Sequence, residues 1–155
     1  METTNFIALS IIIVAVLGIG LGTMTWAYFG KGSVSVLFQE PVLSLPEFPA
    51  TDPGRQASVY YQEGIEAYKS GNYRKAKDKF TSALKLVSTL AEAYQNRGLA
   101  CANLRSDDEA VQNLITASEL YQQQGNGIAL ESLKQNLEAL KQRKLEREKL
   151  KVQGT

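Results

Sequence analysis

The sequence predicts an all-α protein made of a single membrane-spanning helix, an extended proline-rich linker and a short helical solenoid. Three observations support this prediction. Residues 6–29 form an uncharged run rich in Ile, Leu and Val; all four prolines lie between residues 41 and 53; and residues 57–124 repeat one pattern with a period of 34 residues. A fixed period of this length indicates stacked helix-turn-helix units.

The predicted membrane anchor occupies residues 1–30. In a helix, the uncharged run 6–29 is long enough to cross the hydrocarbon core of a bilayer. A cleaved signal peptide is the alternative, although residues 1–5 lack the Lys or Arg that such leaders carry. Glu2 precedes the run and Lys31 follows it, and this bias favours a single-pass protein with its repeats on the cytoplasmic side.

A Gly-x-x-x-Gly spacing lies within the anchor, at Gly18 and Gly22. Such a spacing lets a second membrane helix approach closely, so these glycines are candidates for helix packing in lipid. Glycine is also common in membrane helices without that role. The sequence leaves both interpretations open.

The predicted linker, residues 31–56, contains all four prolines, which prevent a helix and favour an extended path. Disordered linkers are poor in large apolar residues, yet this one contains many of them: Val36, Leu37, Phe38, Val42, Leu43, Leu45 and Phe48. We therefore expect the linker to lie against either the helical repeats or a membrane partner.

Two repeats are predicted, at residues 57–90 and 91–124. Each places a glycine, Gly64 or Gly98, where two helices are expected to cross so closely that a larger side chain would separate them. A large side chain on the second helix of each repeat fills the remaining space. These large residues are Phe80 and Leu114.

The repeats resemble the tetratricopeptide family at most signature positions. The matching pairs are Tyr60 and Tyr94, Gly64 and Gly98, Ala76 and Ala110, Phe80 and Leu114, Ala83 and Ala117, and Leu86 and Leu120. The chain departs from the family at Glu63 and Arg97, where Leu is usual, and it lacks the closing proline. The resemblance implies a concave groove lined by the first helix of each repeat. In that register the protein-binding residues are Tyr61, Ile65, Tyr68, Gln95, Asn96, Leu99 and Asn103.

Residues 125–155 predict a capping helix followed by a basic tail. Apolar residues recur at spacings of three and four, as in an amphipathic helix that covers the last repeat; they are Leu130, Leu133, Leu137 and Leu140. A degenerate third repeat is the alternative. Residues 141–151 then carry six basic and two acidic side chains, which is typical of a solvated helix end or, alternatively, of a docking surface for an acidic partner.

The composition argues against catalysis. The chain has no His, so no His-based metal cluster can form, and its one cysteine excludes a disulfide within the chain. By the tetratricopeptide register, Cys101 points into the helical core, where it would be a poor nucleophile. The formal net charge of +1 gives no support for a nucleic-acid partner. We expect no catalytic residue, metal, cofactor or small-molecule substrate.

The order of anchor, proline-rich linker and short repeat array resembles the photosystem I assembly tetratricopeptide proteins of cyanobacteria and plastids. That resemblance implies a thylakoid protein facing the cytoplasm or stroma, in contact with membrane lipid, which holds photosystem I subunits or assembly intermediates. Two alternatives remain open. The protein could be a general membrane-tethered co-chaperone or scaffold, or a small permanent subunit of a membrane complex.

Overall fold

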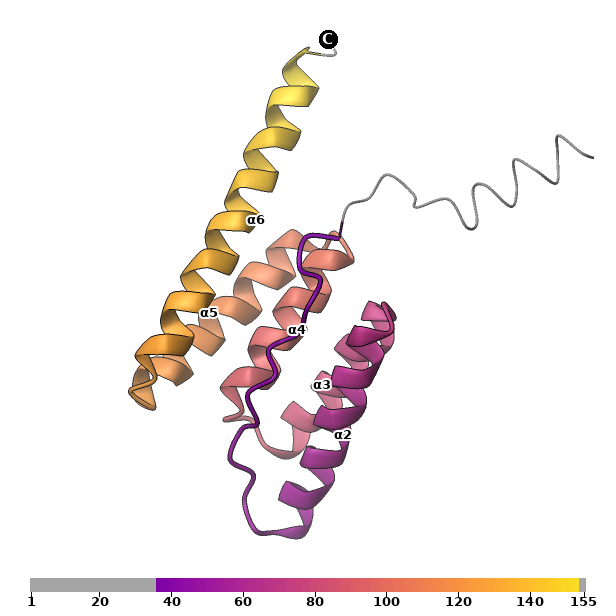
Figure 1. The fold of residues 1–155 in the computed structure, drawn as a ribbon, viewed down its shortest axis with the longest axis vertical. Coiled ribbons are helices and arrows are strands. Elements are labelled where there is room, and N and C mark those ends of the chain that lie inside the picture. Colours follow the sequence, from indigo (N-terminus) through magenta and orange to yellow (C-terminus); the bar gives the residue numbers. More distant parts are fainter. Residues whose placement is uncertain (1–35, 154–155) are drawn as a thin grey trace, which may run out of the picture. The chain divides into compact units, whose positions relative to one another are not determined.

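The computed structural model describes residues 36–153, which form five α-helices and no β-strand. The all-α prediction is confirmed for this part of the chain. The helices are α2 (Asp52–Lys69), α3 (Tyr73–Leu86), α4 (Ala91–Asn103), α5 (Asp107–Gln123) and α6 (Gly127–Gln153) (Figure 1). None of these described helices is both long and apolar enough to cross a membrane. The predicted anchor, with Gly18 and Gly22, lies outside the described residues.

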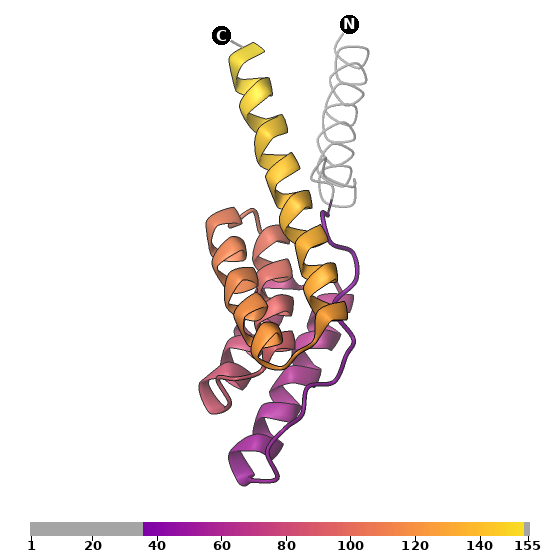
Figure 2. The same ribbon diagram turned by 90° about the vertical axis from the view of Figure 1, so that its left-hand side faces the viewer.

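The first four helices pack as two hairpins. Helix α2 packs mainly on α3, α4 packs mainly on α5, and contacts between α3 and α4 join the two hairpins. Helix α6 packs on α5 (Figures 1 and 2). Its first half therefore lies where the sequence predicts a helix that covers the end of the array.

Helix α2 begins at Asp52, within the segment that the sequence assigns to the linker. For residues 52–56 the prediction of an extended path is wrong, because Pro53 stands in the first helical turn, where its missing N–H breaks no helical hydrogen bond. The Thr51 hydroxyl accepts a hydrogen bond from the Gly54 N–H at 3.2 Å and caps the helix. Thr51 is thus an N-cap residue, which the neighbouring prolines make hard to recognise in the sequence.

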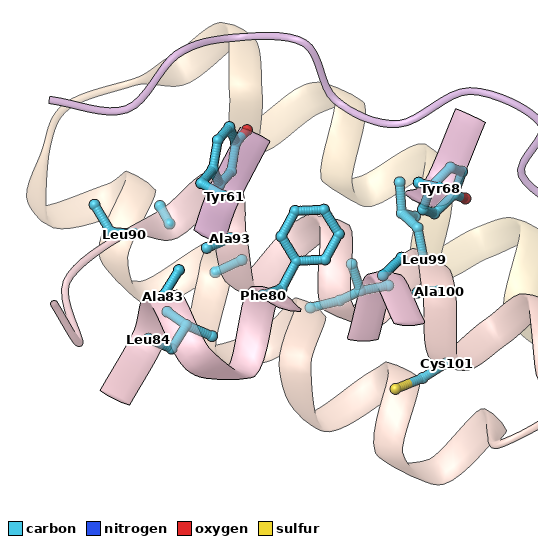
Figure 3. Packing of buried hydrophobic residues seen from close by; sticks show 14 of the residues in the cluster. Tyr61, Tyr68, Phe80, Ala83, Leu84, Leu90, Ala93, Leu99, Ala100 and Cys101 are labelled. Atoms are coloured by element: carbon cyan, nitrogen blue, oxygen red, sulfur yellow. The ribbon is translucent and has the colours of Figure 1, made fainter. Parts of the chain in front are cut away.

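The core confirms the close helix crossings predicted at the two repeat glycines. A Cβ atom at Gly64 would lie 2.6 Å from Phe80, and one at Gly98 would lie 3.1 Å from Leu114. Phe80 stands at the centre of this core, below Tyr61 and Tyr68 (Figure 3). Cys101 is fully buried, as predicted, and burial raises the pKa of its thiol to about 12.

Candidate functional site

Residues 36–49, called the strap below, run as an extended segment across α2 and α4 (Figures 1 and 2). The strap and the helices belong to one compact unit. Pro41 and Pro46 are buried, and Phe38, Val42 and Phe48 are partly buried against the core. The sequence leaves open whether the linker lies against the helical repeats or a membrane partner; in the structure, residues 36–49 lie against the helices.

The first contact between helices and strap is formed by Tyr68 of α2 and Asn103 of α4. The Asn103 side-chain oxygen accepts hydrogen bonds from the N–H groups of Leu37 and Phe38, both at 3.1 Å. Its amide nitrogen donates to the Phe38 carbonyl at 2.7 Å, and the Tyr68 hydroxyl donates to the same carbonyl at 2.8 Å. The two side chains also bond each other at 3.0 Å. We call this pair the Tyr68/Asn103 clamp.

A second clamp of the same composition is formed by Tyr61 of α2 and Asn96 of α4. Asn96 accepts from the Val42 N–H at 2.7 Å and donates to the Val42 carbonyl at 2.9 Å, so one amide satisfies both backbone groups of one residue. The Tyr61 hydroxyl lies 3.0 Å from the Ser44 carbonyl oxygen and accepts a bond from Asn96 at 3.1 Å. This is the Tyr61/Asn96 clamp.

The spacing of the two clamps matches an extended chain. The two tyrosines are seven residues apart on α2 and the two asparagines seven apart on α4, which is a rise of about 10.5 Å along a helix. Phe38 and Val42 are four residues apart, and an extended or polyproline-like chain covers about 12 to 13 Å over that length. Since the clamps bond only backbone groups of the strap, they recognise an extended conformation rather than particular side chains.

The clamps are uncharged. Burial raises the pKa of the Tyr61 hydroxyl, and it likewise raises that of Tyr68, so both hydroxyls remain protonated donors over the whole physiological range. The negative charge of Glu92 also raises the pKa of Tyr61, and burial raises the pKa of the Glu92 carboxyl itself. A neutral surface of this kind suits a peptide backbone better than a charged ligand.

The end of the strap is fixed by two features that sequence reasoning missed. The carbonyl of Pro49 lies so close to α2 that a Cβ atom at Gly54 would be 1.9 Å from it, and only glycine fits there. The rings of Phe48 and Tyr61 meet edge to face with centroids 5.9 Å apart. The Pro53-Gly54 pair in the sequence was the available signal for this close approach, but it reads more simply as a turn.

The seven predicted groove residues divide into three groups. Tyr61, Tyr68, Asn96 and Asn103 form the clamps. Leu99 is buried in the core between the helices, and Ile65 is partly buried. Gln95 is directed to α5, where its side-chain oxygen accepts a hydrogen bond from Tyr121 at 2.9 Å. The structure thus brings together the polar residues of the prediction and separates Gln95 from them.

Comparison with known proteins gives no independent assignment. No family model matches the chain, and no curated protein matches it. Among the residues that the structure describes, no three His, Cys, Asp or Glu side chains lie close enough together to hold a metal ion.

Proposed function

We propose that this chain is a non-catalytic protein-interaction module of the tetratricopeptide type, which binds an extended protein segment by its backbone in the groove between α2 and α4. The observation that carries the proposal is the pair of Tyr/Asn clamps that hold Phe38 and Val42. Side-chain amides that satisfy both groups of a peptide unit provide main-chain affinity, and pockets beside them provide selectivity.

The strap occupies this groove, so a client segment has to exchange with it. A ligand on a short tether has an effective concentration on the order of millimolar, and a free segment of equal affinity would compete poorly at micromolar concentration. A client held in the same membrane as this chain is confined in the same way. Tethering by the predicted anchor therefore supports exchange with a membrane-complex subunit rather than with a soluble peptide.

The narrower assignment is to an assembly or stability factor for a membrane complex, with photosystem I subunits or intermediates as clients at the thylakoid membrane. It is supported by the resemblance in the order of anchor, linker and repeats. A general co-chaperone or scaffold, and a small permanent subunit, are the alternatives. Recovery of partners after gentle solubilisation separates them, because an assembly factor accompanies immature complexes and a subunit accompanies the mature complex at fixed stoichiometry.

The test of the groove is to weaken the strap without changing the helices. Val42→Pro removes the backbone N–H that donates a hydrogen bond to the Asn96 side-chain oxygen. We expect this variant to release the strap and to raise the recovery of client in a pull-down several-fold. Leu45→Pro is the matched control, because Leu45 is 70% exposed and only its neighbour Pro46 is buried; recovery should equal that of the wild type.

A second variant blocks the groove itself. Asn96→Leu keeps the branching and the number of heavy atoms of the side chain but removes its hydrogen bonds to the peptide backbone, so it should lower client recovery. Tyr61 and Leu99 are less suitable, because both belong to the hydrophobic core and their truncation would leave a cavity. Unchanged or lower recovery with Val42→Pro, in a chain that remains folded, would show that the groove serves only to hold the strap.

A further inference from the structure

The apolar stripe of α6 continues beyond Leu140 as a basic stripe with the same spacing. Residues at alternating intervals of three and four along the helix are Leu130, Leu133, Leu137, Leu140, Lys144, Arg147 and Lys151. Leu133 and Leu140 are buried against the body, whereas Lys144 and Lys151 are exposed. The side chains on this face therefore change from leucine to basic beside the start of α5. The C-terminal end of α6 extends past the other helices (Figures 1 and 2).

The basic extension, residues 141–153, is ion-paired to α5 at its base. Arg143 forms an ion pair with Asp107, the first residue of α5, and Arg147 forms a second one with the same carboxylate at 2.6 Å. The Arg143 and Asp107 side chains are only 9% and 15% exposed. These two ion pairs place residues 143–147 of α6 against the start of α5.

The basic extension and the start of the strap lie at the same end of the body. Asn103 at the end of α4 bonds Leu37 and Phe38, and Asp107, four residues later, bonds Arg143 and Arg147. From the end of the predicted membrane span at residue 29 to residue 36, the chain covers at most about 25 Å. The predicted anchor would then bring this end of the body to the bilayer surface.

We propose that the basic extension binds anionic lipid headgroups of the membrane that holds the anchor. Arg143 and Arg147 pair with Asp107, and the other basic side chains of residues 141–151, Lys141, Lys144, Lys149 and Lys151, outnumber Glu146 and Glu148 and complement a negative surface. The exposed apolar side chains here are Leu145, Leu150 and Val152; Leu145 and Val152 share a face, and Leu150 is about 140° from Leu145, so the apolar stripe is only two residues long and too short to enter the bilayer. The contact is electrostatic and lies at the surface. It depends on the predicted anchor but is independent of client binding in the groove.

The experiment uses the full chain reconstituted in vesicles of phosphatidylcholine, with or without phosphatidylglycerol. A membrane-impermeant reagent acylates exposed lysines, and mass spectrometry gives the extent at each position. We expect Lys144, Lys149 and Lys151 to be acylated several-fold less in the anionic vesicles at low salt, with the difference lost at high salt. Lys75 and Lys85, exposed on α3, are the control positions and should react equally in both vesicles.

A matched variant tests whether the lysines act together. With Lys149→Gln and Lys151→Gln, the protection of Lys144 should fall. Equal acylation of Lys144 in the two lipids would overturn the proposal, and so would equal protection of Lys75 and Lys85. Protection that requires an added acidic protein would assign the extension to a protein partner instead. Release of the chain from the vesicles by a carbonate wash would show that residues 6–29 do not span the membrane, and this would also overturn the proposal.

Discussion

Helices α4 and α6 meet the rest of the molecule in opposite ways. Helix α4 is buried on almost every side, and its buried residues include Gln95 and Asn96. Helix α6 is buried along one stripe of its first half and is exposed beyond Arg143. Because buried amides are costly unless they are hydrogen-bonded, α4 depends on the strap as a third layer, whereas α6 packs mainly on α5. The groove beside α4 therefore binds through hydrogen bonds to a peptide backbone, whereas the surface of the basic extension of α6 is defined by its charge.

The largest expected effects are at the helix crossings beneath the strap. Gly64→Ala places a Cβ 2.6 Å from Phe80 and Gly98→Ala places one 3.1 Å from Leu114, whereas nothing lies within 4 Å of a Cβ at Gly127 in α6. Overpacking of a core costs about 1 to 3 kcal/mol, so thermal stability should fall most for Gly64→Ala, less for Gly98→Ala and not at all for Gly127→Ala. Equal melting temperatures for the three variants would show that the helix crossings are not close.

The next effect is at the clamps. Asn96→Leu leaves the N–H of the partly buried Val42 without its partner, whereas the Val42 carbonyl still lies 3.3 Å from the Tyr61 hydroxyl; an unsatisfied buried group costs about 1 to 3 kcal/mol. Asn103→Leu should cost less, because Asn103 is only partly buried and water can reach the strap there. Chemical denaturation of the two variants measures the difference. A larger loss for Asn103→Leu would contradict the assigned burial.

A third prediction concerns Glu92 in the first turn of α4. Burial raises the pKa of its carboxyl, so the folded state binds more protons than the unfolded state between the ordinary and the raised pKa, and stability falls as the pH rises through that window. Glu92→Gln removes the ionisation, so the variant should gain stability relative to wild type at neutral pH and lose that advantage at acidic pH. Unfolding measured across the pH range checks the sign; an advantage that grows in acid would contradict it.

The smallest effect is expected at the surface pair between the two hairpins. Lys77 of α3 and Glu109 of α5 form an ion pair at 2.9 Å, and both side chains are about one third or more exposed. Exposed pairs of this kind contribute about 0.2 to 1 kcal/mol. Lys77→Met should therefore lower the free energy of unfolding only slightly, and raised salt should reduce even that difference. A loss as large as that of Asn96→Leu would contradict this, because an exposed pair would then contribute as much as a clamp residue.

The sequence predicted the clamp residues better than it predicted their ligand. Tyr61, Tyr68, Asn96 and Asn103 follow from the tetratricopeptide register, in which the first helix of each repeat lines the groove. The period of 34 alone would pair Tyr61 with Gln95 rather than with Asn96. A side-chain amide bonds any extended backbone equally well, so the residues cannot distinguish a client from the chain's own linker. The apolar residues of the linker indicated that it packs against another surface. They did not indicate whether that surface is the helical repeats or a membrane partner.

Other features had no periodic signal. The start of α2 was missed because Pro53 was treated as a helix breaker although it stands in the first turn. The ion pairs of Asp107 with Arg143 and Arg147 join residues far apart in the sequence. Their geometry depends on how α6 packs on α5, which propensity and spacing do not determine.

Amide hydrogen exchange along the strap of the full chain, resolved by residue in detergent micelles, tests the central claim most directly. The N–H groups of Phe38 and Val42 are bonded to Asn103 and Asn96, whereas Leu43 is 59% exposed. We predict slow exchange at Phe38 and Val42, fast exchange at Leu43, and acceleration at Val42 in the Asn96→Leu variant and when a client is bound. Fast exchange at Phe38 and Val42 in the unbound wild-type chain would contradict the account, because the clamps would then not hold the strap.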